Sequence, residues 1–109
     1  MRNGILCSGL MGVLLLASPS AFAQKAGDAA KGKEVFEQCS VCHNTDNDDR
    51  KIGPSLKGLF KHQKLANGKA VNEQNVREKI NQGGNGMPSY GDLLSEQEKS
   101  DVLAYLKTL

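Results

Sequence analysis

The sequence predicts an all-α fold in which helices alternate with long loops, and three observations lead to that prediction. Apolar residues recur at helical spacing in three segments, residues 28–43, 72–84 and 95–109. The stretches between them are rich in Asn, Asp, Gly and Pro, which interrupt regular secondary structure. No segment alternates convincingly between polar and apolar residues, as a half-buried strand would.

The first predicted helix covers residues 28–43, with Asp28 as its N-cap. Gly32 and Phe36 lie four residues apart and therefore share one helical face. A glycine at this position lowers helix stability, which is consistent with the close approach of another helix there. The segment closes with the motif CSVCH at residues 39–43.

The second predicted helix is short and is bounded by clear start and stop signals. Asn72 would cap it, and Gly83-Gly84 would end it. Val76 and Ile80 would face inward, because they are four residues apart.

The last predicted helix begins with a capping box, Ser95 and Glu98. Its apolar face consists of Val102, Leu103, Tyr105, Leu106 and Leu109. A glycine-rich loop, residues 83–92, precedes it and carries Met87.

The first 23 residues have the layout of a cleaved secretory signal peptide. Arg2 is followed by an apolar run of thirteen residues and by the small-residue ending Ala21-Phe22-Ala23. A membrane anchor would need ~20 apolar residues, and Cys7 lies too early for a lipoprotein site. We therefore expect a signal peptide at 1–23, a single domain at 24–109, and export.

The expected mature chain is small and has few large side chains for a core. It contains no Trp, and its aromatic residues are Phe36, Phe60, Tyr90 and Tyr105. Domains of this size commonly need a staple or a cofactor. Of the fourteen Lys and Arg residues only Arg2 falls in the leader, so thirteen face twelve Asp and Glu, a balance that favours no nucleic-acid partner.

The CSVCH motif allows four chemical interpretations. A disulfide between Cys39 and Cys42 would close too short a loop to contribute much stability. A redox dithiol is expected after a strand, whereas a helix precedes this motif, and a zinc site would lack ligands beyond His43 and His62. The C-x-x-C-H spacing is instead the signature of covalent haem c attachment. We expect thioether bonds from Cys39 and Cys42, and iron ligation by His43.

The second axial ligand has two candidates, and an open position is a third alternative. Met87 is the only methionine of residues 24–109, and it lies among Gly, Asn and Pro rather than on an apolar helical face. His62 lies in the lysine-rich run FKHQK, which is typical of a solvated surface. We favour Met87, since His/Met ligation suits an electron-transfer haem.

These motifs resemble those of the class I c-type cytochromes across the whole expected mature chain. The segments that carry the resemblance are GDAAKGKEVFEQCSVCH, IGPSLKGLF, MPSY and DVLAYLKTL. The resemblance implies a cytochrome c fold, three to four helices with long loops wrapped around one covalent haem. It further implies that Val102 and Tyr105 pack on the Gly32/Phe36 face, and that the Pro54 carbonyl accepts a hydrogen bond from His43 Nδ1.

The chain departs from longer members of that family at the haem propionates. Lys61-His62 stand where those members have Gly-Arg, and the tryptophan that often binds propionates is missing. We therefore expect His62 to lie near a propionate and to couple the reduction potential to pH.

The resulting functional prediction is a monomeric periplasmic electron carrier rather than an enzyme. Alternatives are a haem-based sensor, a peroxidase-like catalyst, or the electron-relay subunit of a larger enzyme. The segment 50–72 contains six basic residues and no acidic residue, which suggests docking on an acidic partner such as a cytochrome bc-type complex, a terminal oxidase or a periplasmic dehydrogenase. The six are Arg50, Lys51, Lys57, Lys61, Lys64 and Lys69.

Overall fold

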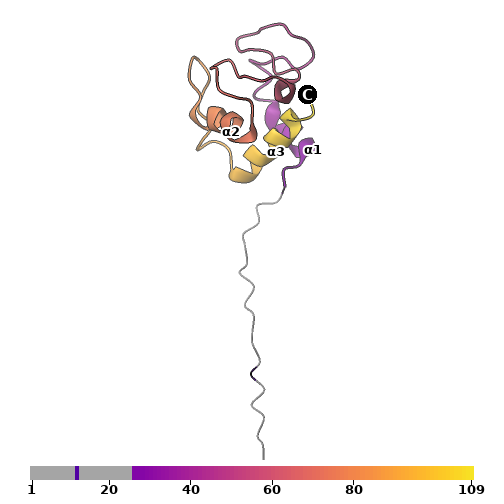
Figure 1. The fold of residues 1–109 in the computed structure, drawn as a ribbon, viewed down its shortest axis with the longest axis vertical. Coiled ribbons are helices and arrows are strands. Elements are labelled where there is room, and N and C mark those ends of the chain that lie inside the picture. Colours follow the sequence, from indigo (N-terminus) through magenta and orange to yellow (C-terminus); the bar gives the residue numbers. More distant parts are fainter. Residues whose placement is uncertain (1–11, 13–25) are drawn as a thin grey trace, which may run out of the picture.

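The computed structural model describes residues 26–109 together with the isolated position 12, and this part of the chain is helical (Figure 1). The elements are α1 (Ala29–Phe36), the 3-10 turn η1 (Leu59–Lys61), α2 (Glu73–Gln82) and α3 (Glu96–Leu106). Extended pairing in the described residues is confined to two isolated bridges, so the all-α prediction is confirmed. Except for position 12, the predicted signal peptide lies outside the described residues. None of the helices described has the length and apolar character to cross a membrane.

Helix α1 begins where the sequence predicts and ends earlier. The Asp28 carboxylate accepts hydrogen bonds from the backbone N–H groups of Ala30 and Lys31 at 2.9 and 3.2 Å. The prediction that the helix continues to His43 is wrong, because α1 ends at Phe36 and turns follow. Hydrogen bonds between residues three apart replace the α-helical pattern there and tighten the chain. One of them joins the Cys39 N–H to the Phe36 carbonyl.

Helix α2 has the predicted boundaries. The Asn72 side chain accepts a hydrogen bond from the Asn75 N–H at 2.7 Å and so caps the first turn. Gly83 ends the helix with a φ of 63°, a conformation that glycine adopts at no steric cost. Val76 and Ile80 are buried, as predicted.

Helix α3 carries the predicted capping box, with Ser95 and Glu98 each bonding the other's backbone N–H. Val102, Leu103 and Leu106 are buried, and the remaining members of the predicted face, Tyr105 and Leu109, are half-buried. Two charged residues of this helix, Lys99 and Asp101, are also buried, although nothing in the apolar pattern marked them.

Helices α1 and α3 pack directly against each other (Figure 1). A Cβ atom at Gly32 would collide with the backbone carbonyl of Asp101, so only glycine allows this approach. The Phe36 and Tyr105 rings meet beside it with 5.2 Å between their centroids. The Asp101 carboxylate also accepts a hydrogen bond from the Asp28 N–H at 2.8 Å, which ties the start of α1 to α3.

We expect Gly32→Ala to destabilise the protein by at least about 2 kcal/mol, because the added methyl group must push two helix backbones apart. Guanidinium unfolding of the holoprotein followed by circular dichroism measures this change. Lys33→Ala, on the exposed side of the same helix, is the matched control and should stay within ~0.5 kcal/mol of the wild type. Equal stabilities of the two variants would contradict the packing argument.

Acid should weaken the link between α1 and α3. The hydrogen bond from the Asp28 N–H, and then that from the Gln97 amide, lower the pKa of Asp101 from its ordinary value. A carboxylate with a lowered folded-state pKa contributes stability that is present above its unfolded-state pKa, about 3.9, and lost as pH falls through the folded-state value. Asp101→Asn should therefore be clearly less stable than wild type at pH 7, and the difference should shrink towards pH 3.

Unfolding midpoints of both proteins at pH 7, 5 and 3 test this expectation. The control is Asp92→Asn, which removes an exposed carboxylate from the loop before α3. A stability difference for Asp101→Asn that does not vary with pH would refute the linkage.

Candidate functional site

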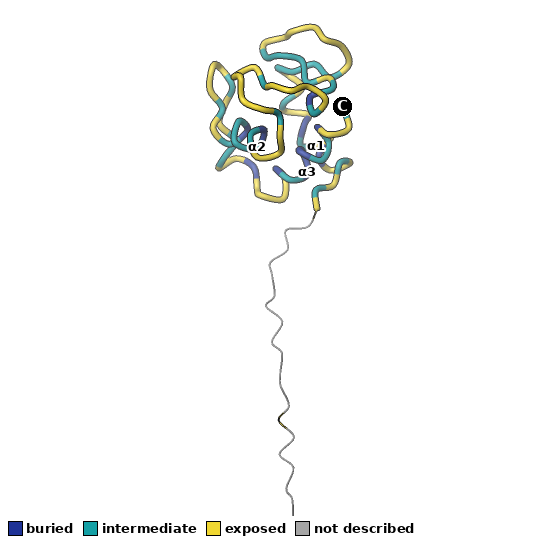
Figure 2. The backbone as a smooth tube through the Cα atoms, in the orientation of Figure 1, coloured by how far each residue is buried: buried dark blue, intermediate teal, exposed yellow. Residues whose placement is uncertain are grey.

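The core of the protein is arranged around a cavity of about 620 Å³. Buried apolar side chains from every helical element and from the loop before α3 line it, namely Phe36, Leu59, Val76, Ile80, Leu94, Val102 and Leu106. Of the buried apolar side chains in the described residues, Leu103 alone does not border this space. Figure 2 shows the buried positions on the inner sides of the helices, with the loops largely exposed. The interior therefore has room for a large apolar group.

The CSVCH motif forms one part of the cavity wall. Turns after α1, including a 3.0 Å bond from His43 N–H to the Cys39 carbonyl, bring Cys39, Cys42 and His43 to the same space. Both cysteine thiols are unpaired and half-buried. Burial, followed by the neighbouring Cys42 thiol, raises the pKa of Cys39. A redox-active dithiol requires the opposite shift, so this environment argues against thiol–disulfide exchange.

The His43 ring is held in one orientation by the segment that follows. Its Nδ1 atom lies 2.7 Å from the Pro54 carbonyl oxygen. Because a carbonyl can only accept, Nδ1 carries the proton and the lone pair of Nε2 remains available for a metal. Gly53 lies against the ring, and a Cβ atom there would come within 2.5 Å of His43 Cε1. A bond of 2.8 Å from Gly53 N–H to the Cys42 carbonyl keeps this segment beside the motif.

Met87 reaches the cavity on a tight turn. Gly84 and Met87 exchange two backbone hydrogen bonds of 2.9 and 3.1 Å across Asn85 and Gly86. Asn85 and Gly86 have φ values of 54° and 90°, the geometry of a type I′ turn, for which Asn-Gly is the preferred sequence. That dipeptide is a sequence signal for the turn, and the prediction of a glycine-rich loop at residues 83–92 missed it.

Helix α2 anchors both ends of this loop. Lys79 Nζ donates to the Gly83 carbonyl at 3.0 Å, which satisfies a group at the end of the helix. Beyond Met87, the Tyr90 N–H donates to the Ile80 carbonyl at 2.9 Å. Burial, followed by the nearby Cys39 and Cys42 thiols, raises the pKa of Tyr90, so the end of the Met87 loop lies close to the cysteine motif. The part played by Lys79 could not be foreseen, because the sequence shows only an ordinary lysine in the last helical turn.

His62 borders the same cavity from its outer side. Its side chain is exposed, and its Nε2 atom lies 3.2 Å from the Lys57 carbonyl oxygen. The cavity thus brings together all six residues that the sequence singled out: Cys39, Cys42, His43, Pro54, His62 and Met87.

The residues present fit a haem better than a bare metal ion. Within residues 26–109, no group of three or more His, Cys, Asp or Glu side chains is arranged to hold a metal. Two thiols, one oriented imidazole and one thioether instead border a cavity with mainly apolar walls. This donor set suits a large apolar macrocycle with one metal at its centre.

Comparison with known proteins gives the family. The family model for cytochrome c matches residues 29–109. The chain belongs to the cytochrome c family. A cytochrome c2 of Blastochloris viridis is 34% identical, and the alignment covers 90% of each chain. A cytochrome c2 of Rhodospirillum rubrum is 38% identical over 57% of this chain, which spans only 45% of that relative.

Solved structures agree with this assignment. The chain superposes on cytochrome c6 of the diatom Phaeodactylum tricornutum with a TM-score of 0.60 and 26% identity, over 75% of this chain and 93% of the other. Cytochrome cH of Methylobacterium extorquens gives a TM-score of 0.59 over 76% of this chain and the whole of that protein, and at 23% identity it supports the fold alone. As a member of the cytochrome c family, the chain carries a covalently bound haem c and takes part in electron transport.

Proposed function

We propose that this cytochrome c is a periplasmic one-electron carrier in which Cys39 and Cys42 form the thioether bonds and His43 and Met87 ligate the iron. The observation that carries the proposal is that these four side chains border one cavity in the core. When bound, the haem supplies an iron that gains or loses one electron without any substrate bond being made or broken. We therefore propose that the chain is not an enzyme in its own right.

The protein's own residues have three tasks in this scheme. The Pro54 carbonyl accepts a hydrogen bond from His43 Nδ1–H, which orients the ring and makes its Nε2 a stronger donor to a metal. Met87 contributes a neutral thioether, which favours the reduced state and raises the potential. The apolar walls exclude water, so little solvent reorganises when the charge changes.

The export signal predicted at residues 1–23 supports the periplasmic location, and residues 24–109 would then form the working domain as a monomer. Its partners would be redox proteins with acidic surfaces. All six basic residues of segment 50–72 are exposed, and Arg50 and Lys64 border the cavity itself. Ile52, 71% exposed, adds an apolar contact at the same rim. A charged rim with an apolar spot suits brief, electrostatically steered encounters.

The ferric protein should show the weak far-red absorption band of a methionine–iron bond, and Met87→Ala should lose it. The variant should also have a lower reduction potential and should bind carbon monoxide when reduced, because a position on the iron becomes open. Absorption spectra and a redox titration measure both effects. His62→Gln is the control and should keep the band. A wild-type protein that lacks the band, or binds carbon monoxide at neutral pH, would indicate the sensor alternative.

Electron transfer through the basic rim should depend on salt in opposite directions for anionic and cationic reagents. Reduction by hexacyanoferrate(II) should slow several-fold between about 0.01 and 1 M ionic strength, because the Debye length falls from about 30 to 3 Å. Transfer with hexaammineruthenium should speed up. Lys64→Glu should weaken both trends, whereas Lys33→Glu, on α1, should not. Rates indifferent to salt would count against the docking surface.

The potential should fall as pH rises through the range in which histidine loses its charge, about pH 5 to 8. The reason proposed is that His62 lies near a haem propionate, where its positive charge favours reduced iron. His62→Gln should flatten the curve of potential against pH. An unchanged curve would refute the role of His62.

A further inference from the structure

Lys99 is a buried cation that the electron-transfer scheme does not yet use. Its side chain, on α3, is only 3% exposed. Burying an ammonium group costs several kcal/mol unless partners compensate it. Two partners are present, the Glu96 carboxylate and the Gly91 backbone carbonyl, each 2.8 Å from Nζ.

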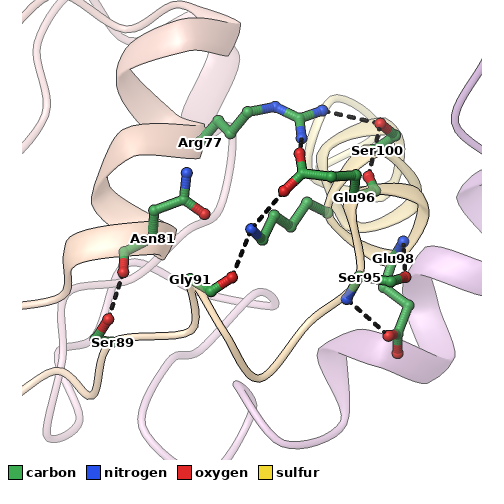
Figure 3. A network of polar contacts seen from close by, with 9 residues as sticks. Arg77, Asn81, Ser89, Gly91, Ser95, Glu96, Glu98 and Ser100 are labelled. Atoms are coloured by element: carbon green, nitrogen blue, oxygen red, sulfur yellow. Dashed lines mark hydrogen bonds and ion pairs between the residues drawn. The ribbon is translucent and has the colours of Figure 1, made fainter. Parts of the chain in front are cut away.

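The carboxylate partner is itself held from the neighbouring helix. Arg77, on α2, donates to the second oxygen of Glu96 at 3.2 Å and to the Ser100 hydroxyl at 2.8 Å (Figure 3). The hydrogen bond from Lys99, and then its charge, lower the pKa of Glu96. The ammonium group therefore has a fixed position between α2, α3 and the loop that joins them.

The carbonyl partner belongs to the loop that carries Met87. Gly91 lies four residues after Met87, and its N–H donates to the Asn81 carbonyl of α2 at 3.1 Å. Ser89, between the two, donates its hydroxyl to the same Asn81 carbonyl (Figure 3). Gly91 is thus bound to α2 through its N–H group and to α3 through its carbonyl, and Lys99 supplies the second of these bonds.

We propose that Lys99 is a positioning residue: by bonding the Gly91 carbonyl it keeps the Met87 loop closed over the haem cavity and so limits how often Met87 leaves the iron. This inference rests on the proposed ligation by Met87. Replacing Lys99 with methionine removes the bond while keeping a long apolar side chain in the same space. The Glu96 carboxylate is 61% exposed and keeps its bond from Arg77, so losing Lys99 leaves no buried unpaired carboxylate, and opening of the loop should increase more than global unfolding does.

Imidazole titration of the ferric holoprotein measures loop opening. Added imidazole reaches the iron only when Met87 has left it, so its apparent Kd is the intrinsic Kd divided by the open fraction. We expect Lys99→Met to lower the apparent Kd at least about tenfold, equivalent to ~1.4 kcal/mol. Lys99→Arg keeps a charged donor at this position and should restore most of the wild-type value.

Lys107→Met is the matched control. Lys107, just after the same helix, also pairs with a glutamate, in this case Glu73 of α2 at 2.8 Å from its Nζ, but it has no bond to the Met87 loop. The control should leave the imidazole affinity unchanged. Equal affinities for wild type and Lys99→Met, or equal increases in Lys99→Met and Lys107→Met, would overturn the proposal.

Two further comparisons apply if the Lys99→Met protein does not fold, or if Met87 is not the iron ligand. If Lys99→Met yields no holoprotein, Glu96→Gln is compared with Glu73→Gln. Only Glu96→Gln should raise the imidazole affinity, and no difference between the two variants would overturn the proposal.

Met87→Ala tests the ligation itself. If it leaves the affinity unchanged, Met87 does not ligate the iron and the role of Lys99 is refuted with it. If it raises the affinity while Lys99→Met does not, the ligation stands and only the role of Lys99 fails.

Discussion

All buried apolar side chains of residues 26–109 except Leu103 border one cavity, and this constraint shapes the helices and the loops around it. Helix α1 packs closely on α3 at Gly32, which forms a rigid pair. Helix α2 makes fewer contacts with α3, and its buried residues Val76 and Ile80 face the cavity. With so few aromatic residues the chain cannot fill this space itself. A covalently attached haem supplies the missing apolar volume, so attachment of the haem also completes the hydrophobic core.

The loops around the cavity are held by hydrogen bonds rather than by regular structure. The Pro54 carbonyl orients His43, and the last carbonyl groups of α2, at Ile80 and Asn81, receive N–H groups from the loop beyond Met87. These carbonyls have no partner within their own helix, so the loop satisfies them while it is fixed in place. The long loops can therefore hold the proposed iron ligands in fixed positions, which an electron carrier requires if its coordination is to stay constant between oxidation states.

The charged residues fall into two groups, one exposed on the surface and one buried in the interior. The basic residues of segment 50–72 are exposed, two of them, Arg50 and Lys64, border the cavity, and such a charged surface would suit transient partners. Buried charges, Lys99 and Asp101, are instead paired with backbone groups and link separate segments of the chain. We propose that the first group serves encounters with redox partners, whereas the second holds segments of the chain in position. Net charge alone, which is close to neutral in the expected mature chain, shows neither role.

The three helices, their caps at Asp28, Asn72 and Ser95, and the attachment motif CSVCH could all be predicted from the sequence, because each depends on residues within a few positions of one another. The sequence could not determine where α1 ends, since the turns after Phe36 follow local bonds that compete closely with the helix. Nor could it show that Lys99 is buried or that Asp101 receives the Asp28 N–H, because those contacts join residues far apart in the chain. These contacts exist only in the folded chain, since a charged side chain is buried only where folding brings it next to a partner.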